Sequence, residues 1–145
     1  MSGQSKQSEP GKIAIVNPKT LLRLEGAAVL IVSLVGYRWS NGGWIEFILV
    51  FLVPDLSMIG YAANACVGAA TYNALHTYIG PFALAGYSIW TGHSSALLIS
   101  LIWIAHIGLD RMLGFGLKYP TRFKDTHLNP DRHALEIKNP IRNSY

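Results

Sequence analysis

Long apolar stretches alternate with short polar breaks through the middle of the chain. They cover about residues 21–37, 44–61, 65–90 and 95–113. Each stretch is close to the roughly 20 residues that a helix needs to cross a bilayer, and the two-residue alternation of half-buried strands is absent. The pattern therefore predicts an all-α fold, a polytopic membrane four-helix bundle.

The polar breaks predict where the helices end. The Ser-Asn-Gly-Gly run at 40–43 and the Thr-Gly-His-Ser run at 91–94 are typical of turns. Pro54 interrupts the second stretch, and Gly80-Pro81 interrupts the third. For the third stretch we favour one long helix kinked at the proline over a helix followed by a re-entrant piece, although the sequence allows both.

Charged side chains are scarce in this central region. Only 14% of the chain is charged, whereas an ordinary soluble domain has about 25%. The charged residues between positions 20 and 109 are Arg23, Glu25, Arg38, Glu46 and Asp55. The other basic residues lie towards the two ends: Lys6, Lys12, Lys19, Arg111, Lys118, Arg122, Lys124, Arg132, Lys138 and Arg142. Positive charge marks the cytosolic side of a membrane, so we expect both termini in the cytosol, as an even number of crossings allows.

Net charge, cysteine content and the N-terminal sequence each argue against a class of protein. A net charge of +4 does not indicate nucleic-acid binding, because the basic residues share no exposed face with aromatic ones. The single cysteine, Cys66, cannot form an internal disulfide or a CxxC metal pair. Residues 1–19 lack the apolar core of a secretory signal.

We expect a polar N-terminal tail at 1–19, a four-helix transmembrane domain at 20–114, and a short basic cytosolic tail at 115–145, whose residues 115–128 could fold back over a site.

Costly polar groups converge on one half of the predicted bundle. With the N-terminus inside, four of them fall in the inner half: Asp55 in the second helix, His76 in the third, and His106 and Asp110 in the fourth. Residues four apart share a helix face, so His106 and Asp110 are neighbours. An ionisable residue inside a membrane usually faces a partner or a cavity, so this convergence indicates a shared site.

The segments that carry these residues resemble a known family. They read LRLEG (22–26), FLVPDLSMIGY (51–61), YNALHTY (72–78) and AHIGLDRMLGFGLKYPTRFKDTHL (105–128), within a match from about Leu22 to Leu128. The chain resembles the membrane family called domain of unknown function 4260, with Phe115 in place of an expected Tyr and Asn129 in place of an expected Gly. The resemblance implies a four-helix membrane protein and singles out the same polar positions, without a reaction. A more distant similarity is to membrane-bound metal-dependent hydrolases.

Two interpretations of the polar residues remain open. The functional one makes Asp55, His76, His106 and Asp110 catalytic, as ligands of a divalent metal (Zn, Fe or Mn) or as a metal-free acid–base site, with no other cofactor. The structural one makes them a hydrogen-bonded network that fixes helix register. Asp125 and His127 could complete a metal site or belong to a solvated tail. Candidate substrate-binding residues are Arg23, Glu25, Asn73, Arg111, Lys118 and Tyr119. Arg23 and Glu25 also suit interfacial ion pairs, and Arg111 and Lys118 suit topology anchors.

The leading functional hypothesis is a membrane-embedded enzyme. It would act on a hydrophobic or lipid-like small molecule in the cytosolic half of the bilayer, with metal-dependent hydrolysis as the first expectation and metal-free isomerisation or cyclisation as the alternative. Hypotheses from other classes are a small transporter or channel subunit and a non-catalytic membrane assembly protein. The transporter hypothesis requires a homo-oligomer, because four helices without repeats make a poor pathway alone. The expected partners are the bilayer and the hydrophobic substrate, not nucleic acid.

Overall fold

The computed structural model describes residues 17–120, and the regular elements in this range are helices. In chain order they are α1 (Pro18–Trp39), α2 (Trp44–Phe51), the 3-10 helix η1 (Pro54–Ala62), α3 (Ala65–Leu75), α4 (Ile79–Thr91) and α5 (Ser94–Leu113). The all-α prediction is confirmed for these residues.

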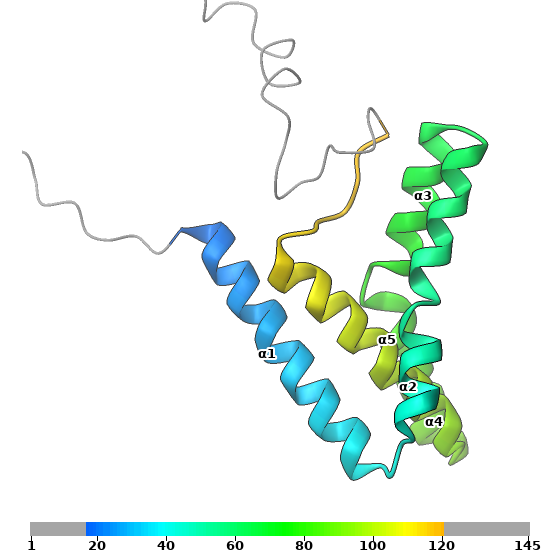
Figure 1. The fold of residues 1–145 in the computed structure, drawn as a ribbon. Helices are drawn as coiled ribbons and strands as arrows, with labels where there is room; N and C mark the ends of the chain where they lie inside the picture. Colours follow the sequence, from blue (N-terminus) through cyan, green and yellow to red (C-terminus); the bar gives the residue numbers. More distant parts are fainter. Residues whose placement is uncertain (1–16, 121–145) are drawn as a thin grey trace, which may run out of the picture.

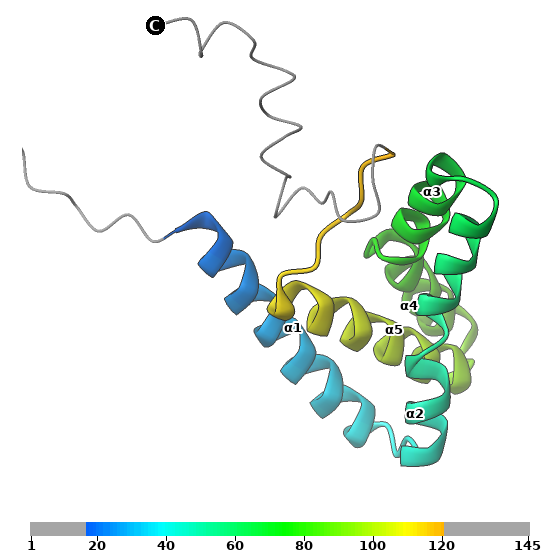
Figure 2. The same ribbon diagram turned by 45° about the horizontal axis from the view of Figure 1, so that its top comes forward.

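Helix α5 lies at the centre of the arrangement. It packs against α1 on one side and against α4 and α2 on the other, while η1 packs against α3. Figures 1 and 2 show α1 running down one side, α2 and η1 rising on the opposite side, and α3 and α4 returning beside them. In the described part of the chain, the buried apolar residues of the core, Tyr72 and Tyr37 among them, come from α1, α3 and α5.

Within residues 17–120, three helical segments are long and apolar enough to cross a membrane. They are Pro18–Trp39, Trp44–Ala62, which combines α2 and η1, and Ser94–Leu113. Three such segments are typical of an integral membrane protein. The remaining predicted crossing, the third stretch at 65–90, is interrupted. Its two helices, α3 and α4, have 11 and 13 residues. At 1.5 Å per residue, neither spans a bilayer of about 30 Å alone.

The interruption of the third stretch lies upstream of its proline. The prediction of one helix kinked at Gly80-Pro81 is wrong: α3 ends at Leu75, and α4 begins at Ile79. Pro81 then falls in the first turn of α4, where its missing N–H would have had no helical partner. The chain therefore turns before the proline rather than at it.

The second stretch is interrupted as well. Helix α2 ends at Phe51, and Pro54 opens η1 in the first position of that helix. Proline cannot donate the backbone bond that would continue α2, so the chain resumes as a tighter 3-10 helix. Thr71 of α3 supports this irregular backbone, because its hydroxyl donates to the carbonyl oxygen of Ser57 at 2.9 Å.

Glycines let α1 and α5 approach closely. A Cβ at Gly26 would lie 2.6 Å from the backbone nitrogen of Met112, and one at Gly108 would lie 2.9 Å from the backbone nitrogen of Leu30. Contacts of this kind between membrane helices depend on small residues, since lipid provides no hydrophobic force between helices. This contact fixes the half of α5 that carries His106 and Asp110.

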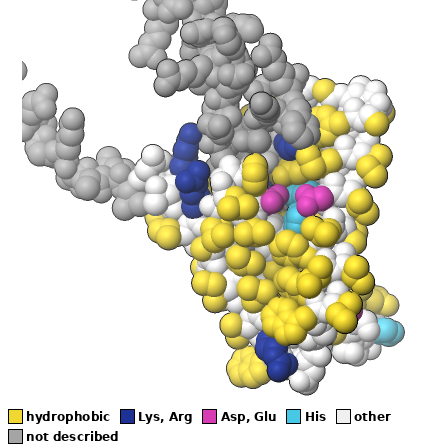
Figure 3. Space-filling model, viewed as in Figure 1, with side chains coloured by type: hydrophobic (Ala, Val, Ile, Leu, Met, Phe, Trp, Pro, Cys, Tyr) yellow, Lys and Arg dark blue, Asp and Glu magenta, His cyan; other side chains and the backbone are white. Residues whose placement is uncertain are grey.

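The outer surface of the helices is largely apolar. Exposed large hydrophobic side chains occur on every element, and α2 with η1 is the least buried of the three candidate spans. Figure 3 shows this apolar surface on one face, interrupted by a small group of acidic and histidine side chains. A surface of this composition suits lipid rather than water.

Candidate functional site

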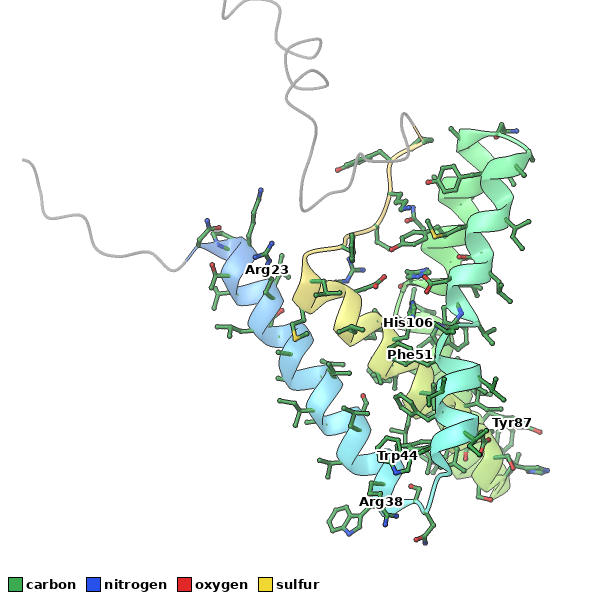
Figure 4. The ribbon with its side chains drawn as sticks, in the orientation of Figure 1. Arg23, Arg38, Trp44, Phe51, Tyr87 and His106 are labelled. Atoms are coloured by element: carbon green, nitrogen blue, oxygen red, sulfur yellow. The ribbon has the colours of Figure 1, made fainter. Side chains whose placement is uncertain are left out.

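Two helix interruptions and one long helix build the candidate site. Asp55 stands in the first turn of η1, directly after the α2–η1 break. His76 caps the C-terminus of α3, at the α3–α4 break. His106 and Asp110 lie one turn apart on α5. We call these four residues the His/Asp cluster. Figure 4 places His106 beside Phe51, near mid-height of the molecule.

The ligating atoms of the cluster lie within a few ångströms of one another. The two Nε2 atoms of His76 and His106 are 3.2 Å apart. Asp55 Oδ1 lies 3.7 Å from Nε2 of His76 and 3.6 Å from Nε2 of His106. One ligand atom from each of these three residues lies within 4.8 Å of the other two. Asp110 Oδ2 is 3.6 Å from His76 Nε2 but is outside this three-residue group.

The ring of His76 has a fixed orientation. Its Nδ1 lies 2.9 Å from the carbonyl oxygen of Tyr72, one turn back on α3. A carbonyl oxygen can only accept, so Nδ1 carries the proton. When the ring is neutral, this tautomer presents the lone pair of Nε2 to the centre of the cluster. A histidine that ligates a metal commonly donates its other N–H to a carbonyl in this way.

Helix α5 also fixes the backbone around His76. The indole Nε1 of Trp103 donates to the carbonyl oxygen of Leu75 at 2.6 Å, and Arg111 Nη2 donates to the carbonyl oxygen of His76 at 3.2 Å. The last carbonyls of a helix have no partner within it. Two side chains of α5 thus satisfy the broken end of α3 and hold it next to His106.

His106 sits in an aromatic and apolar environment. It is 3% exposed, and the ring of Phe51 meets it edge-on with centroids 5.1 Å apart. Its Nδ1 is buried and has no hydrogen-bond partner among the described residues. In the described part of the chain, the imidazole of His106 therefore finds its polar partner at Nε2, which faces His76.

The two carboxylates differ in exposure. The side chain of Asp55 is 48% exposed, although it belongs to the lipid-facing span Trp44–Ala62, whereas that of Asp110 is 18% exposed. Asp110 also accepts a hydrogen bond of 3.1 Å from the hydroxyl of Tyr72. Asp110 is therefore held by protein, while Asp55 stands at the mouth of the site.

Tyr72 connects the cluster to a basic residue. Its ring stacks on that of His76, with centroids 3.7 Å apart, and the ammonium of Lys118 lies over it at 4.4 Å from the centroid. The Lys118 ammonium also lies 5.3 Å from the ring centroid of Tyr61. Burial lowers the pKa of Lys118 below its usual range, and the carboxylates of Asp110 and Asp55 oppose that shift.

The segment after α5 crosses back over α3 and is tied there by one residue. The backbone N–H of Lys118 donates to Asn73 Oδ1 at 2.7 Å, and Asn73 Nδ2 donates to the backbone carbonyl of Lys118 at 2.8 Å. Asn73, a candidate substrate-binding residue from the sequence, therefore positions the backbone of Lys118. The start of the predicted fold-back segment, up to residue 120, thus lies against α3.

The remaining predicted residues are spread more widely. Arg23 lies against Gly114 at the cap of α5, where a Cβ on that glycine would be 2.8 Å from its Nη2. Glu25 and Tyr119 are exposed, and within residues 17–120 no hydrogen bond or ion pair joins Arg23, Glu25 or Tyr119 to the cluster. Asp125 and His127 lie outside the described residues.

Three contributors were not among the residues proposed from sequence. Tyr72, Trp103 and Phe51 all touch the cluster or hold its backbone. Two of them, Tyr72 and Trp103, have sequence features from which a role could have been predicted. A buried tyrosine one turn before a histidine needs a partner for its hydroxyl, and a tryptophan in mid-helix is away from the interfacial belt where membrane tryptophans gather. Phe51 carries no such signal.

Comparison with known proteins supports one family. The family model described as domain of unknown function (DUF4260) matches residues 19–130. The chain belongs to this family. No curated protein and no solved structure matches it. The family match covers all four residues of the cluster and brings no reaction.

Proposed function

We propose that this DUF4260 protein is a membrane-embedded, metal-dependent enzyme that hydrolyses a hydrophobic or lipid-like substrate. The observation that carries the proposal is the convergence of Asp55, His76 and His106, which offer three ligand atoms from three separate elements. Two of the three residues are buried. Three protein ligands with one open position are typical of catalytic zinc sites.

The distances suit one ion. Zinc–nitrogen and zinc–oxygen bonds of about 2.0–2.2 Å in a tetrahedron put neighbouring ligand atoms roughly 3.3–3.6 Å apart. The separations in the cluster are 3.2, 3.6 and 3.7 Å. The set of two imidazoles and one carboxylate also suits iron or manganese. A divalent cation would further neutralise Asp55, whose half-exposed carboxylate is otherwise costly beside lipid.

The residues would divide the work as follows. Asp55, His76 and His106 would hold the ion, which would supply a lowered pKa of water and a Lewis acid for a substrate carbonyl or phosphoryl oxygen. Asp110, which lies 3.6 Å from His76 Nε2, would act as the general base that accepts a proton from water. Tyr72 orients Asp110 through its hydroxyl.

The substrate would enter from the bilayer. Asp55 opens the site on a surface whose neighbours, such as Leu56 and Ile59, are exposed and apolar. In this arrangement α3 and α4 act together as a discontinuous fourth crossing, a form that membrane proteins use where irregular backbone lines a site. Both termini would then lie on one side, and the positive charge near them favours the cytosol for that side.

A metal-free enzyme is the alternative that the geometry also allows. A separation of 3.2 Å between two Nε2 atoms is compatible with a hydrogen bond in which His106 donates and His76 accepts. The pair, with Asp110, could then move protons in an isomerisation or cyclisation. In that case the carboxylate of Asp55 has to be neutralised by other means.

Metal content decides between these two. Detergent-purified protein, incubated with Zn, Mn and Fe(II) in turn and desalted, is analysed by inductively coupled plasma mass spectrometry. Wild type is compared with His106→Ala and with His93→Ala, which removes an exposed histidine at the start of α5. We expect one ion per chain in wild type and His93→Ala and none in His106→Ala, with unchanged circular dichroism. Metal-free wild type under every condition contradicts the proposal.

The reaction class is read from product mass. Metal-loaded protein is reconstituted in liposomes of natural lipid extract and incubated. The lipids before and after incubation are compared by mass spectrometry. Hydrolysis predicts products that together gain the mass of one water, whereas isomerisation and cyclisation predict products of unchanged mass. If the lipids stay unaltered in every extract and solutes cross the membrane of the same liposomes, the result favours a transporter instead.

A further inference from the structure

The His/Asp cluster lies well inside the membrane-spanning part of the chain. His106 comes seven residues before Leu113, the end of α5, which at 1.5 Å per residue is roughly 10 Å along the helix. Asp55 comes seven residues before Ala62, the end of η1, which at the 2.0 Å rise of a 3-10 helix is roughly 14 Å. Two separate spans thus place the cluster at a similar depth, and the reacting bond of a substrate has to reach that depth.

This depth disfavours a substrate with a charged headgroup. The headgroups of phospholipids lie outside the hydrocarbon core, so a phosphate would have to move about 10 Å into hydrocarbon before the esters beneath it met the cluster. A charge at that position is costly unless a group of opposite sign receives it. A neutral ester brings only two hydrogen-bond acceptors to the same depth, at a much smaller cost.

The surface around Asp55 is apolar, and its charge is negative. The charged side chains of the span Trp44–Ala62 are Glu46 and Asp55, and both are acidic. Leu56 and Ile59, which follow Asp55 on η1, are 60% and 70% exposed. An acidic opening in an apolar surface repels a phosphate or a carboxylate and admits an uncharged lipid.

The two basic residues near the cluster have other contacts. Arg111 donates to the carbonyl oxygens of His76 and Phe115, at the broken end of α3 and just after α5. The ring of Tyr72 has the imidazole of His76 stacked on it at 3.7 Å and the ammonium of Lys118 over it at 4.4 Å from the centroid. Two groups this close to one ring occupy its opposite faces, so the tyrosine ring stands between that ammonium and His76.

A row of aromatic rings leads from the cluster to the start of α2. The ring centroid of Phe51 lies 5.1 Å from that of His106, Phe47 lies 5.3 Å from Phe51, and Trp44 lies 5.8 Å from Phe47. We call Trp44, Phe47 and Phe51 the aromatic row, and Figure 4 shows two of its members along α2. Phe47 and Phe51 are half-buried and Trp44 is exposed, so the row borders lipid and offers an apolar chain a surface that ends at the cluster.

We propose that the substrate is a neutral ester of a long-chain carboxylic acid and an apolar alcohol, with one chain against the aromatic row. This inference rests on the proposed metal-dependent hydrolysis and names its substrate class. The oxygen of water bonds to the ester carbonyl carbon, and the bond from that carbon to the alkoxy oxygen breaks. One proton of the water passes through Asp110 to the alkoxy oxygen, so the products are a carboxylic acid and an alcohol.

The first test compares two esters of the same acid. Metal-loaded protein is reconstituted in bilayers of ether-linked phosphatidylcholine, which contain no ester bond of their own. One added substrate is hexadecyl oleate, and the other is a phosphatidylcholine with one hexadecyl ether and one oleoyl ester. We expect oleate, measured by mass spectrometry at equal mole fractions, to be released at least tenfold faster from hexadecyl oleate. Equal or faster release from the phospholipid overturns the inference and leaves metal-dependent hydrolysis standing.

The second test does not depend on catalysis. A long-chain ketone with a diazirine beside its carbonyl has no bond to hydrolyse, and it is irradiated with metal-free and with metal-loaded protein. We expect mass spectrometry to find the label within residues 44–55, and excess hexadecyl oleate but not the phospholipid to suppress it. Phe47→Ala should lower labelling and oleate release at least fivefold at unchanged metal content and circular dichroism. Ile48→Ala, which truncates a 62% exposed side chain of the same helix, should change neither.

The remaining outcomes separate the two proposals. Undiminished labelling and release in Phe47→Ala, or labelling that the phospholipid suppresses as well as hexadecyl oleate does, overturns the inference. Labelling that hexadecyl oleate alone suppresses, in a protein that binds no metal and cleaves neither ester, leaves the neutral-lipid site standing and removes the hydrolytic function.

Discussion

Replacing Gly26 by alanine should separate α1 from the helix that carries half of the site. The added Cβ would lie 2.6 Å from the backbone nitrogen of Met112, 2.7 Å from Cβ of Arg111 and 2.8 Å from the carbonyl oxygen of Gly108. None of these atoms is the end of a flexible side chain. The overlap can be relieved only if the two helix backbones move apart by several tenths of an ångström.

The size of the effect follows from two opposing contributions. Overpacking of a well-packed contact typically costs about 1–3 kcal/mol, and alanine gains up to about 1 kcal/mol over glycine within a helix. We therefore expect Gly26→Ala to lower the free energy of unfolding by about 1–2 kcal/mol. Gly36→Ala on the same helix is the matched control, because its Cβ would lie 3.5 Å from Leu101 Cδ2, an ordinary contact. Only the helix gain applies there, so Gly36→Ala should be neutral or stabilising.

Unfolding of the detergent-solubilised protein by increasing mole fraction of dodecyl sulfate, followed by circular dichroism, measures both variants. Co(II) titration of the same samples should show weaker binding in Gly26→Ala alone, because Gly108 is two residues from His106 and moves with it. Equal stability of the two variants would refute the close α1–α5 contact. A destabilised Gly26→Ala that binds cobalt as tightly as wild type would refute the link between that contact and the site.

Three further predictions concern the site itself. Trp103→Phe keeps an aromatic side chain but removes the indole N–H that satisfies the end of α3, so cobalt affinity should fall about tenfold. Trp90→Phe makes the same change at a position that is 89% exposed and should have no effect in the same titration. Tyr72→Phe should leave the metal content unchanged but lower turnover in the liposome assay at least tenfold, because Asp110 loses its orienting bond; unchanged turnover would remove Tyr72 from the mechanism. Asp55→Asn should abolish metal binding and yet stabilise the metal-free protein in the dodecyl sulfate assay, since a half-exposed carboxylate leaves a lipid-facing span; a less stable metal-free variant would contradict this.

The helical spans and the residues of the cluster could be predicted because each depends on local pattern. A run of about 20 apolar residues predicts a crossing without knowledge of its neighbours. The cost of a charge in lipid predicts that Asp55, His76, His106 and Asp110 face protein or a ligand, and their distance along each helix predicts a common depth. The structure brings these four side chains together.

What could not be predicted depends on contacts between helices. Gly80-Pro81 was the strongest breaking signal in the third stretch, yet the chain breaks before it, where Trp103 and Arg111 can bond to the carbonyls of Leu75 and His76. Those donors belong to α5 and lie 28 and 35 residues away in sequence from the carbonyls that they satisfy. Asn73 pairs with the backbone of Lys118 for the same reason: its partner comes from a segment whose path the local pattern does not specify.

The two helix interruptions explain why the site lies where it does. An interrupted helix exposes backbone carbonyls and N–H groups that lipid cannot satisfy, so each break needs polar side chains around it. A metal or acid–base site also needs polar side chains shielded from lipid. His76 meets both needs at the α3–α4 break, because its Nδ1 donates to the carbonyl oxygen of Tyr72 while its Nε2 lies 3.7 Å from Asp55 at the other break. The regular half of α5 then supplies His106 and Asp110 from a rigid helix, while Trp103 and Arg111 of the same helix secure the break. Substitutions of His76, Trp103 or Arg111 should therefore affect metal affinity and local structure together, whereas a substitution of Asp55, whose exposed carboxylate makes no hydrogen bond to backbone within residues 17–120, should affect metal affinity without disturbing the break.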